Sequence, residues 1–185
     1  MEIISLAQYV NTPATVLHVF AVILGMGGAL VSDMLFSFFS KNKNLNPTEI
    51  STLSILRTIV FYALIVVAIS GFILFLGDMD RYMNSAKFLA KMSILAILII
   101  NGYILNKVVW PRVIKQGFFT NIKDRYMRML AFVCGAVSVI SWISVLILAV
   151  LNRLTMSYSL IMLLYLSIII FGIIIALVLE KKEFN

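Results

Sequence analysis

Five long runs of apolar residues, separated by short polar stretches, divide this chain. They cover approximately residues 12–39, 55–76, 86–110, 129–151 and 157–179. Each run meets or exceeds the ~20 residues that a helix needs to cross a bilayer core of ~30 Å, and each is far too long for a barrel strand. The pattern therefore predicts an all-α, polytopic membrane bundle of five transmembrane helices. Because no repeat or long linker interrupts it, residues 1–185 are expected to form one integral membrane domain.

Short local signals mark where these helices should begin and end. Pro13 is expected in the first turn of the first helix, where its missing N–H costs nothing. Asn46 and Glu49 are expected to cap the approach to the second helix. Gly77 should close the second helix, and Pro111 should close the third, because proline disrupts a helix interior.

Composition and charge agree with a lipid environment. The chain is 62% hydrophobic and 12% charged, with a mean hydropathy of +1.06. A soluble domain of this length cannot bury so much apolar surface, so the lipid bilayer is the expected partner. The net charge is +7, but the basic residues lie beside helix ends and do not form a DNA-binding face, so no nucleic acid is expected as a partner. The single cysteine excludes an intrachain disulfide and a thiolate cluster.

The distribution of basic residues predicts the orientation. The second connection is nearly neutral, and the fourth carries only Arg153. The first and third connections are basic, through Lys41, Lys43 and Arg57 in the first and Lys107, Arg112, Lys115, Lys123, Arg125 and Arg128 in the third. The expected location is the cytoplasmic (inner) membrane. By the positive-inside rule, the N-terminus should lie on its outer side and the C-terminus on its cytoplasmic side.

Two nitrogen-bearing side chains lie inside the apolar runs. His18, the only histidine, lies about six residues into the first run, and Lys91 about five residues into the third. With both helices running inward, their depths differ by only ~2 Å. Polar groups in hydrocarbon are costly and therefore functional candidates, and a neutral imidazole and amine can ligate a metal or haem iron or transfer a proton. The alternatives are an imidazole bonded to a neighbouring helix and a lysine that snorkels to the interface.

Small residues surround the histidine. Gly25 and Ala29 share a helical face with His18, and Gly28 lies beside them. Such residues either permit tight helix packing or leave room for a flat ligand. The predicted cofactor-binding set is therefore His18, Lys91, Gly25 and Gly28, with His18 and Lys91 as the metal ligands.

A second polar set is expected at the other end of the same helices. Asp33 needs a partner, and Arg57, Asn106 and Lys107 lie at matching depth. One interpretation is an ion pair that fixes helix register. The other is a relay for a proton or a cation, in which Asn101 lies between the two ends.

Motifs of soluble enzymes are not found in the sequence. There is no phosphate loop, dinucleotide fingerprint, zincin motif or nucleophile elbow, so no catalytic residue is assigned and enzymatic activity is left open. The scattered methionines suit core filling better than a copper site.

Three stretches resemble a known membrane superfamily. The resemblance covers its first three helices, which correspond here to residues 17–28 (LHVFAVILGMGG), to the pair Ser70-Gly71, and to residues 87–92 followed by Asn101-Gly102 and Pro111-Arg112. The superfamily joins copper-resistance-D-type (CopD-like) proteins and HemJ-type protoporphyrinogen oxidases. Residues 27–33 (GGALVSD) look closer still to an uncharacterised bacterial group of predicted integral membrane proteins in the same neighbourhood.

The resemblance implies a haem b held by His18 and Lys91. It also implies oxidation of protoporphyrinogen IX, with electrons passing to a respiratory-chain partner. The chain departs from the HemJ pattern in having five expected spans and not four. A bis-histidine haem site would need a second protomer, hence a homo-oligomer. The alternative functions are a proton or metal-ion (copper) transporter and a non-catalytic membrane subunit without a cofactor.

Overall fold

The computed structural model describes residues 2–40, 45–115, 124–151 and 155–184, and these residues form helices with no strand. Five helical stretches are long and apolar enough to cross a membrane: Asn11–Ser40, Pro47–Gly77, Ala86–Val113, Arg125–Val150 and Tyr158–Lys182. The prediction of an all-α membrane bundle with five spans is therefore confirmed. Of the basic residues used for the orientation, Lys41, Lys43, Lys123 and Arg153 lie outside the described residues.

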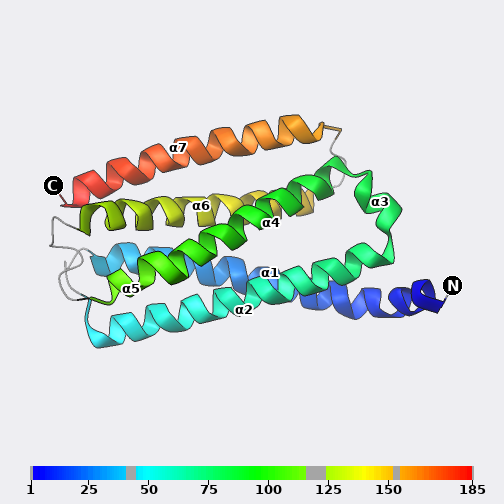
Figure 1. The fold of residues 1–185 in the computed structure, drawn as a ribbon, viewed down its shortest axis with the longest axis horizontal. Coiled ribbons are helices and arrows are strands. Elements are labelled where there is room, and N and C mark those ends of the chain that lie inside the picture. Colours follow the sequence, from blue (N-terminus) through cyan, green and yellow to red (C-terminus); the bar gives the residue numbers. More distant parts are fainter. Residues whose placement is uncertain (1, 41–44, 116–123, 152–154, 185) are drawn as a thin grey trace.

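The helices run side by side along the long axis of the molecule (Figure 1). In chain order they are α1 (Glu2–Ser40), α2 (Pro47–Gly77), α3 (Met79–Met83), α4 (Ala86–Ile104), the π-helical η1 (Leu105–Val109), α5 (Trp110–Val113), α6 (Arg125–Val150) and α7 (Tyr158–Phe184). We call the end at which α1, α5 and α7 finish and α2 and α6 begin the basic end. The opposite end, where α3 joins α2 to α4, is the α3 end.

Helix α6 is the centre of the bundle. It packs against α1, α4 and α7, whereas α1 packs along α2. Within the described residues, neither α1 and α4 nor α2 and α4 share an extensive interface. The largest fully buried side chain, Trp142, belongs to α6 and is 1% exposed. The α1–α2 pair is therefore attached to the other helices mainly through α6.

The outer surface of the bundle is apolar. Large side chains such as Phe20, Phe72 and Phe171 are more than half exposed. In water this surface would be costly, whereas lipid solvates it at no such cost. The exposed apolar faces therefore indicate contact with a lipid bilayer.

Helix α2 begins with a capping box. The Asn46 side chain accepts a hydrogen bond from the Glu49 backbone N–H at 2.9 Å, and the Glu49 carboxylate accepts one from the Asn46 N–H at 2.8 Å. These bonds satisfy two backbone donors that a helix start leaves free, so the predicted cap is confirmed. Because the cap starts the helix at Pro47, α2 begins earlier than the expected span and ends, as expected, at Gly77.

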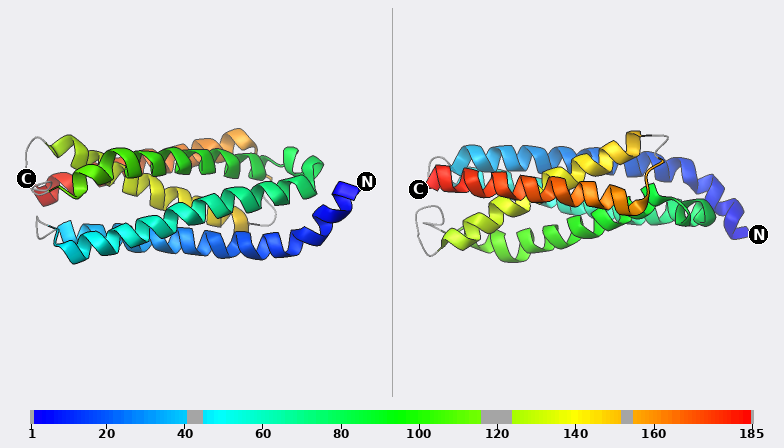
Figure 2. Two further views of the ribbon diagram at one scale, coloured as in Figure 1. Left: turned by 60° about the horizontal axis from the view of Figure 1, so that its bottom comes forward. Right: turned by 90° about the horizontal axis from the view of Figure 1, so that it is seen from above.

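Both proline predictions were wrong. Pro13 lies inside α1, because α1 already begins at Glu2, and Figure 2 shows the N-terminal part of α1 bending away. A proline inside a helix lacks an N–H donor and commonly causes such a bend. Pro111 does not close the third span, which continues to Val113. The π-helical η1 widens the helical turn just before Pro111. In a regular α-helix the proline ring would clash there with the Lys107 carbonyl.

Candidate functional site

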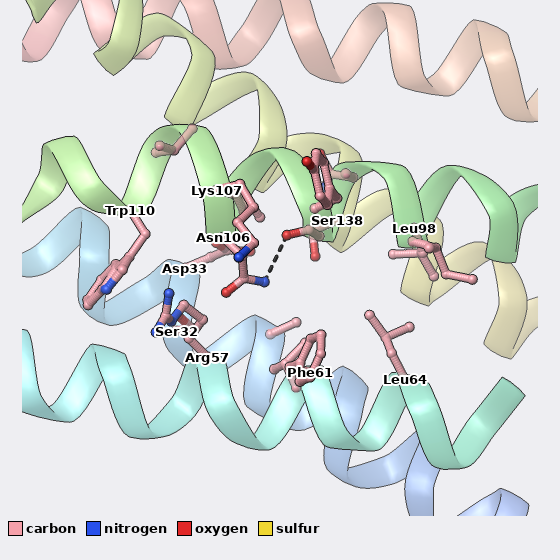
Figure 3. A pocket seen from close by; sticks show the side chains of 18 of the residues that line it. Ser32, Asp33, Arg57, Phe61, Leu64, Leu98, Asn106, Lys107, Trp110 and Ser138 are labelled. Carbon is pink, nitrogen blue, oxygen red and sulfur yellow. Dashed lines mark hydrogen bonds between the residues drawn. The ribbon is translucent and has the colours of Figure 1, made fainter. Parts of the chain in front are cut away.

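A cavity of about 390 Å³ lies between α2 and α4, in the half of the bundle nearer the basic end. We call it the α2–α4 cavity. Its walls come from α1, α2, α6 and the continuous stretch α4–η1–α5, and most of them are apolar (Figure 3). Leu64, Leu98 and Trp142 are typical of these walls. The cavity exists because α2 and α4 are held apart along this length.

The rim of the cavity faces lipid. Phe61 and Ile65 on α2 and Ile99 and Tyr103 on α4 line the cavity and are also among the exposed large apolar side chains. Exposed apolar groups on a spanning helix contact hydrocarbon. The opening between α2 and α4 is therefore lateral, toward the bilayer.

Polar side chains from three elements gather at one end of this apolar space. They are Asp33 of α1, Arg57 of α2, and Asn106 and Lys107 of η1 (Figure 3). Asn101 also lines the cavity, so all four residues of the predicted relay or helix-pairing set border one space. Their role as a relay stays a prediction.

Arg57 and Asp33 are not joined to each other. None of the ion pairs among the described residues includes either side chain. The Arg57 guanidinium carbon instead lies 4.7 Å from the centre of the Trp110 ring, a cation–π contact that spans from α2 to α5. The buried atoms Arg57 Nε and Asp33 Oδ2 have no hydrogen-bond partner in the part of the chain that the structure describes. Buried polar atoms of this kind are uncommon and call for an explanation.

Two neighbouring groups have internal partners. Asn101 donates a hydrogen bond to the Cys134 carbonyl at 3.0 Å, which ties α4 to α6. Asn106 donates to the Gly102 carbonyl at 2.8 Å, one turn back in its own helix. Gly135 of α6 makes room for Asp33, because a Cβ there would stand 3.3 Å from Asp33 Oδ1. Asn101 therefore has a packing role in addition to bordering the cavity.

His18 and Lys91 lie nearer the α3 end and do not line the α2–α4 cavity. Both are half-buried. Lys91 acts electrostatically on His18, but no hydrogen bond among the described residues joins them. His18 belongs instead to the α1–α2 interface, where its ring packs against Gly71, and a Cβ at Gly71 would stand 3.3 Å from His18 Cε1.

The hydrogen bonds of Ser70 determine the protonation pattern of His18. His18 Nδ1 lies 3.0 Å from Ser70 Oγ. The single Ser70 hydroxyl proton is donated to the Val66 carbonyl at 2.5 Å. With the hydroxyl oriented in this way, Ser70 accepts from His18 in the tautomer that carries its proton on Nδ1, and the ring's lone pair is then on Nε2.

The space beside the two predicted cofactor glycines is filled by side chains. A Cβ at Gly25 would stand 2.5 Å from Trp142 Cη2, and one at Gly28 would stand 3.0 Å from Val60 Cγ2. Both glycines thus permit close helix packing, one of the two interpretations of the sequence pattern. Their role in cofactor binding stays a prediction.

Sequence reasoning did not identify the aromatic part of the site. Trp110 and Trp142 are the only two tryptophans of the chain, and both line the α2–α4 cavity. The available signal was Pro111, since a proline late in a span favours a π-helical distortion before it, and such distortions are frequent at functional sites. In this chain the distortion, η1, supplies Asn106 and Lys107.

Comparisons with protein-family models, curated proteins and solved structures find no match to this chain. The residues and their geometry therefore carry the argument about function. Within the described residues, no three His, Cys, Asp or Glu side chains lie together as a metal-binding group.

Proposed function

We propose that this integral membrane protein binds a small amphipathic molecule, taken up from the bilayer into the α2–α4 cavity. One observation carries the proposal. An apolar cavity that opens to lipid ends at a donor, Arg57 Nε, and an acceptor, Asp33 Oδ2, that the protein leaves without partners.

The energetics favour an occupant with a polar head and an apolar body. A buried donor without a hydrogen bond, such as Arg57 Nε, costs free energy, which an accepting head group on the ligand would recover. The apolar walls fit a hydrocarbon body, and 390 Å³ falls within the roughly 300–1,000 Å³ of typical ligand cavities.

Filling the cavity is expected to abolish binding. Ala68 lines the cavity, whereas its neighbour Ile69 is 57% exposed on the outer face of α2. We expect stearyl alcohol brominated at mid-chain to quench the tryptophan fluorescence of the protein in nanodiscs in a saturable manner. The saturable part should disappear in Ala68→Phe, because the phenyl group occupies the ligand's space, and persist in Ile69→Phe.

Saturation distinguishes this signal from quenching by the alcohol dissolved in bulk lipid, which can reach the partly buried Trp110. Quenching that rises without saturation, equally in all three proteins, would refute the proposal. The gathered polar residues would then have a packing role, as in a non-catalytic membrane subunit.

A second candidate, haem b binding at His18, is favoured by the Ser70 hydrogen bond. A histidine that ligates a metal usually donates its other ring N–H to an acceptor, which fixes the ring and its tautomer. In the tautomer that carries its proton on Nδ1, His18 has this arrangement, with Nδ1 bonded to Ser70. In this candidate, Lys91 would supply a second nitrogen ligand. When bound, the haem would supply redox chemistry at this position.

Absorption spectroscopy tests this second candidate. Purified protein supplied with haemin is expected to show a Soret band that is lost in His18→Ala. Ser70→Ala should weaken haem affinity by about 10- to 100-fold, because it removes the group that orients the ring. Ser93→Ala, at a hydroxyl on α4 that contacts Tyr158, is the matched control and should bind normally. A featureless spectrum in the wild-type protein would exclude haem.

A further inference from the structure

The cavity has an excess of positive charge. Among its described lining residues, Arg57 and Lys107 are cationic and Asp33 is the only carboxyl. Neither Arg57 nor Asp33 takes part in an ion pair with a described residue. A charge in an apolar site is costly unless an opposite charge compensates it, and its interactions are strengthened where water is excluded. A ligand with a single negative charge would balance the lining.

The arrangement of Arg57 suits an oxyacid. One face of its guanidinium lies against Trp110, so its hydrogen bonds are made through the edge of the plane. Nε belongs to that edge, is buried and has no hydrogen-bond partner among the described residues. A carboxylate matches such an edge with two parallel N–H···O bonds. Figure 3 shows Arg57, Lys107 and Trp110 at the same end of the cavity.

Asp33 narrows the choice of head group. Its carboxyl lies on the α1 wall of the same space, against Gly135 of α6. A second negative charge on the ligand would meet this carboxyl, and repulsion of that kind discriminates between otherwise similar ligands. The site therefore favours a monoanion over a dianion such as a phosphate monoester.

The long dimension of the cavity suits one hydrocarbon chain. Along α2 the part of the cavity between Arg57 and Ala68 corresponds to about 16 Å of helix. This length is close to half of a ~30 Å bilayer core. A hydrocarbon chain would thus lie along the cavity while its head reaches Arg57.

We infer that the ligand of the α2–α4 cavity is a long-chain carboxylic acid whose carboxylate is bound by Arg57 and Lys107. This inference rests on the proposed function, since it names the class of molecule that the cavity takes. The acid would enter sideways between the exposed Phe61 and Tyr103.

Equilibrium binding of radiolabelled stearate to the wild-type protein in phosphatidylcholine nanodiscs tests the inference. Stearate should bind saturably, and both stearyl alcohol and stearyl phosphate should compete roughly 10- to 100-fold more weakly, the loss expected for a charge-assisted hydrogen-bonded pair. Arg57→Leu should weaken stearate binding by a similar factor. Arg57→Lys should weaken it less, because lysine keeps the positive charge but lacks the two parallel N–H donors of the guanidinium. Arg81→Leu, at a side chain that is 78% exposed on α3, is the matched control.

Each outcome separates the head-group inference from the cavity proposal. Equal binding of stearate and stearyl alcohol to the wild-type protein would overturn the carboxylate while leaving the cavity ligand-binding. Absence of saturable binding by either compound would overturn both. Displacement of stearate when phosphatidylglycerol replaces phosphatidylcholine would overturn the fatty acid in favour of a phospholipid phosphate.

Discussion

Replacing Glu180 with alanine is expected to lower the free energy of unfolding by about 3–5 kcal/mol, the usual cost of breaking a buried ion pair by removing one of its charges. Glu180 Oε1 lies 3.4 Å from Arg128 Nε, and the two side chains are only 4% and 7% exposed. The pair links α7 to α6 at the basic end. Unfolding in mixed micelles, followed by circular dichroism as the fraction of denaturing detergent rises, measures the change.

The neighbouring Lys181 supplies the control, because it is exposed on the same turn of α7. Lys181→Ala should change stability by less than about 0.5 kcal/mol. Combining Glu180→Leu with Arg128→Met should recover much of the loss, since apolar replacements leave no isolated charge. If Glu180→Ala unfolds like Lys181→Ala, the pair is solvated and does not hold α7.

The second large effect is expected at Gly25. Gly25→Ala should destabilise the protein by about 1–3 kcal/mol, as overpacking of a filled core does. The added methyl group would stand 2.5 Å from Trp142 Cη2 and 3.3 Å from the Ala63 Cβ, so a fully buried indole has to move. The same unfolding assay measures the loss, and the tryptophan emission of the folded protein should shift because Trp142 changes its surroundings.

Gly27 provides the comparison, since a Cβ there meets nothing within 4 Å. Gly27→Ala is expected to leave stability unchanged or raise it by up to about 1 kcal/mol, the difference in helix propensity. Equal effects of the two substitutions would show that α1 does not pack closely against Trp142.

The spans could be predicted from the sequence because a helix in lipid must satisfy its own backbone, so apolar length alone identifies it. The ends of the spans were less accessible. Local rules for proline predict a helix start at Pro13 and a helix end at Pro111. Both helices continue past these positions, in the second case with the π-helical η1 just before the proline. The burial of Glu180 could not be predicted from the sequence, because its contact with Arg128 depends on how α6 and α7 pack together.

The site was predicted in part for a similar reason. Residue depth can be read from a helix, and Asp33, Arg57 and Asn106, which the sequence places at matching depth, line one space in the structure. Which helices are neighbours cannot be read in this way. The sequence placed His18 and Lys91 at similar depth but left open whether they face each other, and it gave no sign that the hydrogen-bond partner of His18 is Ser70 of the second span. The cation–π contact of Arg57 with Trp110 likewise depends on a pairing that only the fold reveals.

The attachment of the α1–α2 pair has a mechanical consequence. Besides the packing of α1 on α6, two aromatic contacts join the pair to the α4–η1–α5 stretch. Phe75 stacks on Phe88 with ring centres 5.5 Å apart near the α3 end, and Arg57 lies over Trp110 near the basic end. A guest that widens the gap between α2 and α4 would therefore strain both contacts, together with the close packing of Gly25 on Trp142.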